Sequence, residues 1–378
     1  MKSQRAVFWR GVQTFIGSVI GVGVFGLPFV FAQAGIGIAL IHLVFLGIIN
    51  LLFLLIYSDI VRNTKGHHRM TGIVEIYMGR AWALFSTVIQ FLGVWGAIIA
   101  YIIIGGTFSH VLLSPLLGGE VFIYQIGFFL VSSLLVLGGI GFVSRIEAFL
   151  VFTLLIMLAV VVGGSASHIE WTNLMTVDTT QWFLPFGVVL FAFGGISAIP
   201  EVADVLGKDK RNLSRAIAAG IGIVALVYLV FSFVVVGVAG LGTSQDAVQG
   251  LGAVVGDWVL IVGSIVGLFS VLTSFLVLAA SIMNTLIYDF KWPYLGSWLT
   301  AVLIPLIVFL FGARSFIDVV GFTGSVLVGV SGLLILYMYM KAKGHVCLPK
   351  RCLAIPSWVV FLCGLVFTFG IVVTFLGL

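Results

Sequence analysis

Apolar residues run along this chain in long stretches that short polar clusters interrupt. Each stretch is long enough for an α-helix to cross a bilayer and carries few charged side chains. The pattern therefore predicts an all-α membrane protein with eleven transmembrane helices. The predicted spans are Val12–Phe31, Gly37–Tyr57, Trp82–Leu112, Phe122–Phe142, Ala148–Gly164, Phe183–Val205, Ala216–Leu241, Trp258–Tyr288, Leu295–Phe311, Ile317–Met340 and Ser357–Leu378.

The first span is interrupted by residues that break helices. Gly21, Gly23 and Gly26 lie within it, and Pro28 follows. Their G-x-G-x-x-G spacing matches a dinucleotide-binding turn, but such a turn needs a preceding strand and an acidic residue about twenty positions later. The first acidic residue in the chain is Asp59, which lies too far along the sequence for such a turn. Broken backbone at membrane depth is tolerated only where it lines a cavity or is buried in protein, so the pattern predicts a binding site halfway through the bilayer.

The sixth span carries a second interruption, Phe193–Ser197, which Pro200 follows. Glycines also serve close helix packing, and either interruption alone is equally consistent with that role. Because five spans separate the two, they run in opposite directions through the membrane. Two discontinuous helices at matching positions of oppositely oriented halves predict an inverted-repeat transporter. The predicted five-helix repeats are residues 1–164 and 182–340, and the extra eleventh helix is 357–378.

Composition agrees with a membrane protein that has many spans. The chain has 378 residues, of which 61% are hydrophobic and 8% are charged, whereas soluble domains average about 25% charged residues. The formal net charge of +5 does not indicate nucleic-acid binding, because the basic residues are spread over short loops. The motif G-x-x-x-x-G-K-[ST] is absent, which argues against an ATP-driven pump within this chain.

Enzymatic chemistry finds little support in the sequence. Within the predicted spans the histidines are His42 and His110, and neither lies beside a nucleophile turn. His345, Cys347 and Cys352 lie close together in sequence, but their spacing matches no standard zinc pattern and a fourth ligand is missing. We therefore predict no enzyme activity, no metal centre and no cofactor.

The basic residues predict the orientation of the chain. Cytoplasmic loops of membrane proteins are enriched in Lys and Arg. If the N-terminus is cytoplasmic, 17 of the 18 basic residues fall on the inner side and only Arg314 falls outside. The basic start and the sequence Ala32-Gln33-Ala34 resemble a signal peptide, but the apolar stretch is too long and contains a proline. We expect a retained first span in the plasma membrane, with the C-terminus outside. The inner residues are Lys2, Arg5, Arg10, Arg62, Lys65, Arg69, Arg80, Arg145, Lys208, Lys210, Arg211, Arg215, Lys291, Lys341, Lys343, Lys350 and Arg351.

Both interruptions resemble motifs of a known group of transporters. Gly17–Pro28 (GSVIGVGVFGLP), followed by Ala32–Gly35 (AQAG), is similar to the first-span motif of amino acid permeases. Leu190–Glu201 (LFAFGGISAIPE) is similar to their sixth-span motif. The chain resembles the amino acid/auxin permeases and the hydroxy and aromatic amino acid permeases of the amino acid–polyamine–organocation superfamily. The resemblance implies a LeuT-type fold and secondary transport of an amino acid together with an ion.

Broken helices supply what an amino acid headgroup needs. Free N–H groups and the positive dipole end of the half-helix beginning near Gly23 suit a carboxylate. Free carbonyls of the half-helices that end near Ile20 and Phe193 suit an ammonium group. Glycine allows close approach of the backbone to a ligand. The predicted substrate-binding residues are Ser18, Val19, Gly21, Val22, Gly23, Phe191, Ala192, Phe193, Gly194 and Gly195.

Four further residues are candidates for gating or proton transfer. Phe191 or Phe193 is an aromatic gate over the site or an ordinary packing residue. Tyr101 of the third span reaches the site with its hydroxyl or is a satisfied interior tyrosine. Glu201 carries a coupling proton, closes an inner gate with a basic residue, or favours the start of a half-helix at the wet inner surface.

The resemblance also implies a sodium site. In sodium-coupled relatives, a hydroxyl pair on the eighth span meets carbonyls of the first span. The matching hydroxyls are those of Thr273 and Ser274, and the matching carbonyls are those of Gly17, Ile20 and Ser270. Alternatively, these hydroxyls only bond back to their own helix. Some proton-coupled relatives carry a lysine in the fifth span, and its absence here favours Na⁺ over H⁺ as the coupling ion.

The residues and the resemblance together predict a symporter that imports an L-amino acid by alternating access. An interior acidic residue that would suit a cationic substrate is missing, which favours a neutral amino acid. An amino acid sensor, or a non-coupled facilitator or exchanger on the same scaffold, is the alternative. The expected partners are the small-molecule substrate and membrane lipid, with neither nucleic acid nor ATP; the sequence leaves the oligomeric state open.

Overall fold

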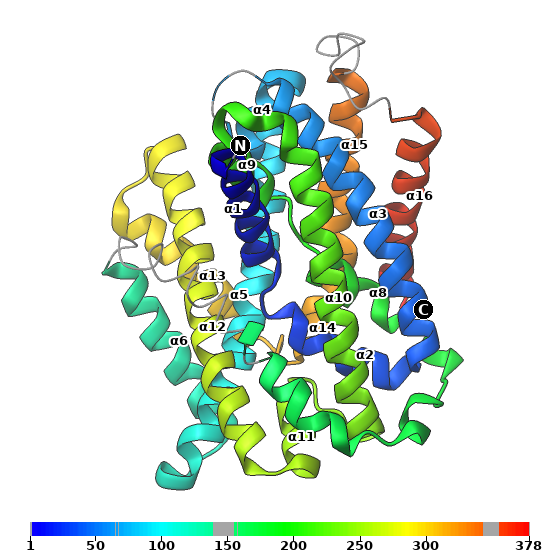
Figure 1. The fold of residues 1–378 in the computed structure, drawn as a ribbon. Coiled ribbons are helices and arrows are strands. Elements are labelled where there is room, and N and C mark those ends of the chain that lie inside the picture. The colour runs from blue at the N-terminus through cyan, green and yellow to red at the C-terminus, as the bar shows by residue number, and fades with distance from the viewer. Residues whose placement is uncertain are drawn as a thin grey trace.

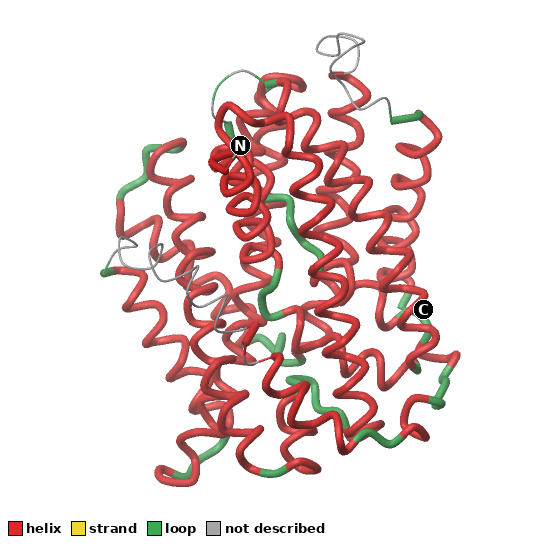
Figure 2. The backbone as a smooth tube through the Cα atoms, viewed as in Figure 1, coloured by secondary structure: helices red, strands yellow, loops and turns green. Residues whose placement is uncertain are grey.

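The chain folds into a bundle of helices. The computed structural model describes residues 2–64, 66, 68–138, 155–156, 158–342 and 355–377, and these contain helices and loops but no strand (Figure 2). Helices satisfy their own backbone hydrogen bonds, which a bilayer cannot do for them. The prediction of an all-α protein is confirmed.

The helices keep the order in which the apolar stretches occur in the sequence (Figure 1). A further apolar helix, Leu158–His168, lies between α6 and α8. The α-helices are α1 (Lys2–Val19), α2 (Gly23–Ala34), α3 (Ile36–Asn63), α4 (Met70–Met78), α5 (Arg80–Leu117), α6 (Val121–Leu137), α8 (Leu184–Ala192), α9 (Ala198–Leu206), α10 (Leu213–Ala239), α11 (Val248–Val255), α12 (Asp257–Asn284), α13 (Tyr294–Leu310), α14 (Phe316–Phe322), α15 (Gly329–Ala342) and α16 (Ser357–Leu376).

Among the described residues, six helical segments are long and apolar enough to cross a membrane, and the bent pair α1–α2 raises that number to seven. Other predicted spans correspond to shorter elements, namely α6, the helix at 158–168, α13 and the pair α8–α9. Large apolar side chains such as Ile41, Phe45 and Ile48 of α3 are exposed, as expected for a surface that faces lipid. Much of the predicted fifth span, Ala148–Gly164, lies outside the described residues, as do the basic residues Lys65, Arg145, Lys343, Lys350 and Arg351.

Both predicted interruptions are breaks in the helices. Helix α1 ends at Val19 and α2 begins at Gly23, and the two helices meet at an angle of 61°. Helix α8 ends at Ala192 and α9 begins at Ala198. In Figure 2 the connecting segments are seen in the middle of the bundle. The backbone therefore leaves helical geometry at depth in two places.

Two π-helical turns interrupt other long helices. The turn η7 (Thr285–Asp289) ends α12, and the turn η8 (Thr323–Val328) separates α14 from α15. Such turns are frequent at functional sites because they open the regular ladder of backbone hydrogen bonds. No sequence pattern predicts either turn.

A loop closes the end of the bundle opposite the N-terminus (Figure 1). It contains the short 3₁₀ helices η3 (Trp171–Leu174) and η4 (Thr179–Gln181). The Glu170 amide donates to the Gly237 carbonyl at 2.9 Å, and the Asp178 amide donates to the Ala34 carbonyl at 3.2 Å. These bonds fasten the loop to the ends of α10 and α2.

Candidate functional site

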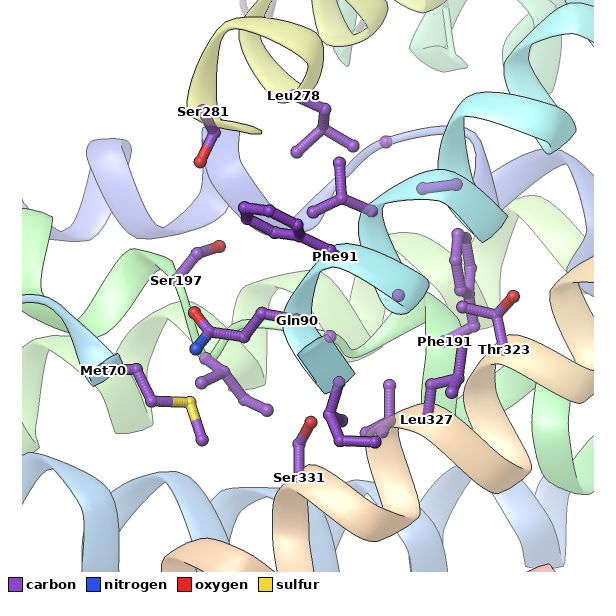
Figure 3. A pocket seen from close by; sticks show the side chains of 18 of the residues that line it. Met70, Gln90, Phe91, Phe191, Ser197, Leu278, Ser281, Thr323, Leu327 and Ser331 are labelled. Carbon is purple, nitrogen blue, oxygen red and sulfur yellow. The ribbon is translucent and has the colours of Figure 1, made fainter. Parts of the chain in front are cut away.

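A cavity of about 260 Å³ lies between the two breaks. Segments of α4, α5, α12, η8 and α15 complete its wall. Figure 3 shows Phe91, Leu278 and Leu327 around the cavity together with polar side chains such as Gln90 and Ser197. Concave sites with an apolar wall and a few placed polar groups are typical of small-molecule binding.

Most of the predicted cradle residues line this cavity. They come from both breaks, so the fold brings together two segments that are about 170 positions apart in the sequence. The lining residues among them are Ser18, Val19, Gly21, Val22, Gly23, Phe191, Ala192 and Gly194.

Phe193 and Gly195, the other two predicted substrate-binding residues, are not among those that line the cavity. The Phe193 side chain is fully buried, and its ring centroid lies 5.5 Å from that of Tyr228. Gly195 faces Phe15 and Val19, and a Cβ atom added to it would lie 3.1 Å from Val19 Cγ2. Both residues pack the break against α1 and α10. Between the two candidate gate residues, only Phe191 reaches the cavity.

Close packing of the backbone explains why the first residue of α2, Gly23, is a glycine. A Cβ atom added to Gly23 would lie 2.8 Å from the Ala192 Cα atom. A contact with backbone cannot be relieved by a rotamer change, so the position accepts only glycine without a shift of one helix against the other. The two breaks therefore touch each other at Gly23 and Ala192.

Side chains of two neighbouring helices satisfy carbonyls at the helix breaks. Asn50 of α3 donates its amide hydrogen to the Phe193 carbonyl at 2.8 Å. Tyr228 of α10 places its hydroxyl 2.8 Å from the Ala192 carbonyl and 3.3 Å from the Val19 carbonyl. Neither Asn50 nor Tyr228 stands out in the sequence, because a lone polar residue in an apolar helix does not indicate which carbonyl it meets.

A polar cluster on α4 and α5 extends along the cavity. The Gln90 side-chain amide donates to the Thr71 hydroxyl at 3.2 Å and to the Ser86 hydroxyl at 3.0 Å. Thr71 also contacts the Thr87 hydroxyl at 3.1 Å. Gln90, Thr71 and Thr87 all line the cavity. No sequence pattern predicts this cluster, because its members are ordinary polar residues on two separate helices.

Tyr101 lies at the first break. It lines the cavity, and its hydroxyl oxygen would be 3.6 Å from a Cβ atom added to Gly21. Its side chain is buried on α5. The phenol therefore lies between α5 and the first break.

The residues expected to bind sodium are not among those that line the cavity. The Thr273 hydroxyl donates to carbonyls of its own helix, at 3.1 Å to Phe269 and 3.0 Å to Ser270. Gly17 lies in the last turn of α1, and Ile20 follows that helix. In this structure the Thr273 hydroxyl thus has the back-bonded geometry that was the alternative to a cation ligand.

A second cavity of about 560 Å³ adjoins the first and shares Met70, Thr71, Gln90, Ile196, Ser197, Ser281 and Thr285 with it. Its other lining residues include the charged groups Arg69, Glu75, Arg80 and Asp289. Its lining includes residues of α4 and α9, and these helices lie at the same end of the bundle as the N-terminus (Figure 1). Together the two cavities extend from these helices toward the two breaks.

Glu201 lies on α9 near the second cavity, and a carboxylate oxygen is 3.9 Å from Arg69 Nη1. The side chains are 45% and 77% exposed, respectively. Ion pairs that are exposed to this extent contribute at most about 1 kcal/mol. Within the described residues no group of His, Cys, Asp and Glu is arranged to hold a metal ion. The rejected candidates His345, Cys347 and Cys352 lie outside them.

The fold matches that of solved transporter structures. The crystal structure of MhsT in complex with L-phenylalanine superposes with a TM-score of 0.70 at 16% identity, over 97% of each chain. A manganese transporter mutant from Eremococcus coleocola gives the same TM-score at 14% identity, over 99% of this chain and 86% of that one. At such identities the likeness shows a shared fold, and the LeuT-type architecture is common to this group.

The family follows from the sequence. The model of the tryptophan/tyrosine permease family matches residues 4–376, so the chain belongs to that family. The tyrosine-specific transport system 1 of Haemophilus influenzae is 24% identical over 358 residues, 89% of this chain and 88% of the relative. A putative sodium-coupled neutral amino acid transporter 11 of Danio rerio is 34% identical over 96 residues, 24% of this chain and 20% of the relative. The predicted resemblance to aromatic amino acid permeases is confirmed, and the chain is an integral membrane transport protein rather than an enzyme.

Proposed function

We propose that this protein is a secondary active transporter that imports an aromatic L-amino acid, tyrosine or tryptophan, together with a cation. The observation that carries the proposal is the cavity between the two helix breaks, which combines backbone of both breaks with an apolar wall. Family membership supports the substrate class, as do the tyrosine-specific relative and the phenylalanine bound to MhsT.

The ends of the half-helices provide for the headgroup. The N-terminus of α2 at Gly23 presents free N–H groups and the positive end of a helix dipole, which suit the carboxylate. The C-termini of α1 and α8 present the carbonyls of Val19 and Ala192, which suit the ammonium group. Ser18, Gly21, Val22 and Gly194 complete the cradle as lining residues. No charged side chain is needed for this recognition.

The rest of the cavity suits an aromatic ring. Phe91 and Val94 of α5, Leu278 of α12 and Leu327 of η8 contribute apolar surface. Gln90 adds an amide that can donate to or accept from a phenol hydroxyl and can accept from an indole N–H. A neutral aromatic side chain fits this wall better than a charged one, because desolvating a charge without a partner is costly.

We further propose alternating access between two inverted five-helix repeats, residues 1–164 and 182–340, with 357–378 as the extra helix. The second cavity, which Arg69 and Arg80 help to line, supports an inward-facing state. These basic residues also favour a cytoplasmic N-terminus. The proposed location is the plasma membrane. The loop bonded to α2 and α10 would then close the outer side. The C-terminus would lie outside.

Sodium is the proposed coupling ion, held by carbonyls of Gly17, Ile20 and Ser270 and by hydroxyls of Thr273 and Ser274. Thr273 would turn from its own helix to the ion. A potential of 100 mV supplies about 2.3 kcal/mol per charge, which sustains roughly forty-fold accumulation of substrate. A proton carried by Glu201 is the alternative coupling ion. The exposed ion pair between Glu201 and Arg69 makes a proton less favoured than sodium. Unchanged pH dependence of uptake in Glu201→Gln would exclude this alternative.

A thermal-shift screen of the purified protein against the twenty amino acids tests substrate and ion together. Tyrosine and tryptophan should stabilise the protein, by about 2.7 kcal/mol at a hundred times Kd, and more in sodium than in potassium buffer. Glycine and lysine serve as controls. Stabilisation by lysine and not by an aromatic amino acid would contradict the proposal.

A sensor on the same scaffold would also bind the substrate, so binding alone does not distinguish a transporter from a sensor. Counterflow in proteoliposomes does, because a transporter exchanges labelled for unlabelled tyrosine across the membrane. We expect counterflow, and uphill accumulation when an inward sodium gradient is imposed. Counterflow without accumulation would identify a facilitator or exchanger.

A further inference from the structure

The hydroxyl of Tyr228 lies between two helix ends that come from opposite halves of the chain. It is 2.8 Å from the Ala192 carbonyl, which ends α8, and 3.3 Å from the Val19 carbonyl, which ends α1. Tyr228 is fully buried in α10 and is not among the cavity-lining residues, whereas Val19 and Ala192 are. The phenol therefore approaches both carbonyls from behind the cavity wall.

Two negative helix ends meet at this point. The last carbonyls of a helix lack partners within it and carry the negative end of its dipole, about half an elementary charge. Placing two such ends together is unfavourable unless a positive group is shared between them. The Tyr228 hydroxyl has one proton to donate, whereas each carbonyl has two lone pairs. It can hold the two carbonyls together, but it leaves most of their acceptor capacity unused.

We propose that Tyr228 is a positioning residue for the ammonium group of the substrate. Its single proton keeps the Val19 and Ala192 carbonyls close together on the cavity wall, so that their remaining lone pairs act as one site for a cationic group. The inference rests on the proposed function, because it assigns the ammonium of the transported amino acid to this pair. It adds a residue that never touches the substrate but sets the geometry of the groups that do.

The chain offers a matched control for this idea. Ser232, on the same helix, is also fully buried, and its hydroxyl has no hydrogen-bond partner among the described residues. Tyr228→Phe and Ser232→Ala therefore each remove one buried hydroxyl from α10. Only the first removes a proton shared between the two carbonyls.

The test measures uptake of L-tyrosine into proteoliposomes by the wild type, Y228F and S232A. Y228F should raise KM about tenfold or more, with kcat within about threefold of the wild type. S232A should leave both values within about twofold. Replacement of Tyr228 by para-aminophenylalanine, which keeps a donor at the same place, should restore KM to within about threefold. If Y228F does not fold, para-fluorophenylalanine replaces it as the variant that lacks the proton.

Each outcome decides the matter. An unchanged KM in Y228F would overturn the inference, as would a fall in kcat at unchanged KM, or a failure of para-aminophenylalanine to restore KM, since a merely structural tyrosine behaves in these ways. A wild-type protein that takes up neither tyrosine nor tryptophan would contradict the proposed function, and the inference with it. Failure of the proposed function is therefore seen in the wild type, and failure of the inference is seen in the Tyr228 variants.

Discussion

The break between α1 and α2 leaves three residues between the two helices, Ile20–Val22, whereas the break between α8 and α9 leaves five, Phe193–Ser197. Both are closed by short local bonds, for example from the Val24 amide to the Gly21 carbonyl at 3.3 Å and from the Ala198 amide to the Gly195 carbonyl at 3.2 Å. At the second break, Asn50 of α3 also bonds to a carbonyl. The two breaks thus differ in this side-chain bond and not in their local backbone bonds.

The difference shows which break depends on its neighbours. Gly23 fixes the first break by backbone contact with Ala192, a contact of shape alone. Tyr228 of α10 bonds to carbonyls at both breaks, whereas Asn50 of α3 adds a hydrogen bond at the second, so a carbonyl there is oriented by a further residue far away in the sequence. Changes that add volume should therefore affect the first break, and changes that remove a donor should affect the second.

The largest effect should follow from adding one methyl group at the first break. In Gly23→Ala the new Cβ atom would lie 2.8 Å from the Ala192 Cα atom. Overpacking of this kind costs about 1–3 kcal/mol, and we expect kcat/KM for tyrosine uptake to fall about tenfold to hundredfold.

Gly222→Ala is the control for this change, because a Cβ atom there meets nothing within 4 Å. Uptake by the control should stay close to that of the wild type. Equal uptake by the two variants would show that contact between the two breaks does not shape the site.

A smaller effect is expected from removing the donor at the second break. Asn50→Leu keeps a similar volume but leaves the buried Phe193 carbonyl without its donor. Leaving a buried acceptor unsatisfied costs about 1–3 kcal/mol, so the melting temperature of the detergent-solubilised protein should fall, and uptake should fall severalfold.

Ser232→Ala provides the comparison for Asn50→Leu. The Ser232 hydroxyl is buried on α10 and has no partner within the described part of the chain. Its removal should leave the melting temperature unchanged. If Asn50→Leu melts at the same temperature as Ser232→Ala, the second break does not depend on α3.

The smallest effect concerns the cation proposed beside the first break. Thr273→Val removes one hydroxyl ligand and should raise the half-saturating sodium concentration about two- to tenfold. Thr368→Val is matched to it, because that hydroxyl also bonds back to its own helix, to the Gly364 carbonyl at 2.8 Å. The half-saturating sodium concentration of tyrosine uptake is measured for both variants. Equal values would show that Thr273 is not a sodium ligand.

Much of the site could be predicted because its signals are local. Closely spaced glycines followed by a proline weaken a helix locally, and both breaks lie at the predicted positions. Backbone that leaves a helix at membrane depth must line a cavity or be buried, and Gly21 and Gly194 line the cavity. The direction of a single side chain depends on the neighbouring helices, so the sequence does not reveal that the Phe193 ring packs against Tyr228.

The sequence by itself determined an all-helical membrane protein with two broken helices and the family motifs around them, because helix length, apolarity and helix breaking depend on short segments of chain. Only the tertiary structure decided that Tyr228 meets Val19 and Ala192, that Asn50 meets Phe193, and that the Gln90 cluster lines the cavity. These contacts depend on how helices far apart in the sequence are rotated and shifted against one another. A spacing of residues along one helix does not contain that information.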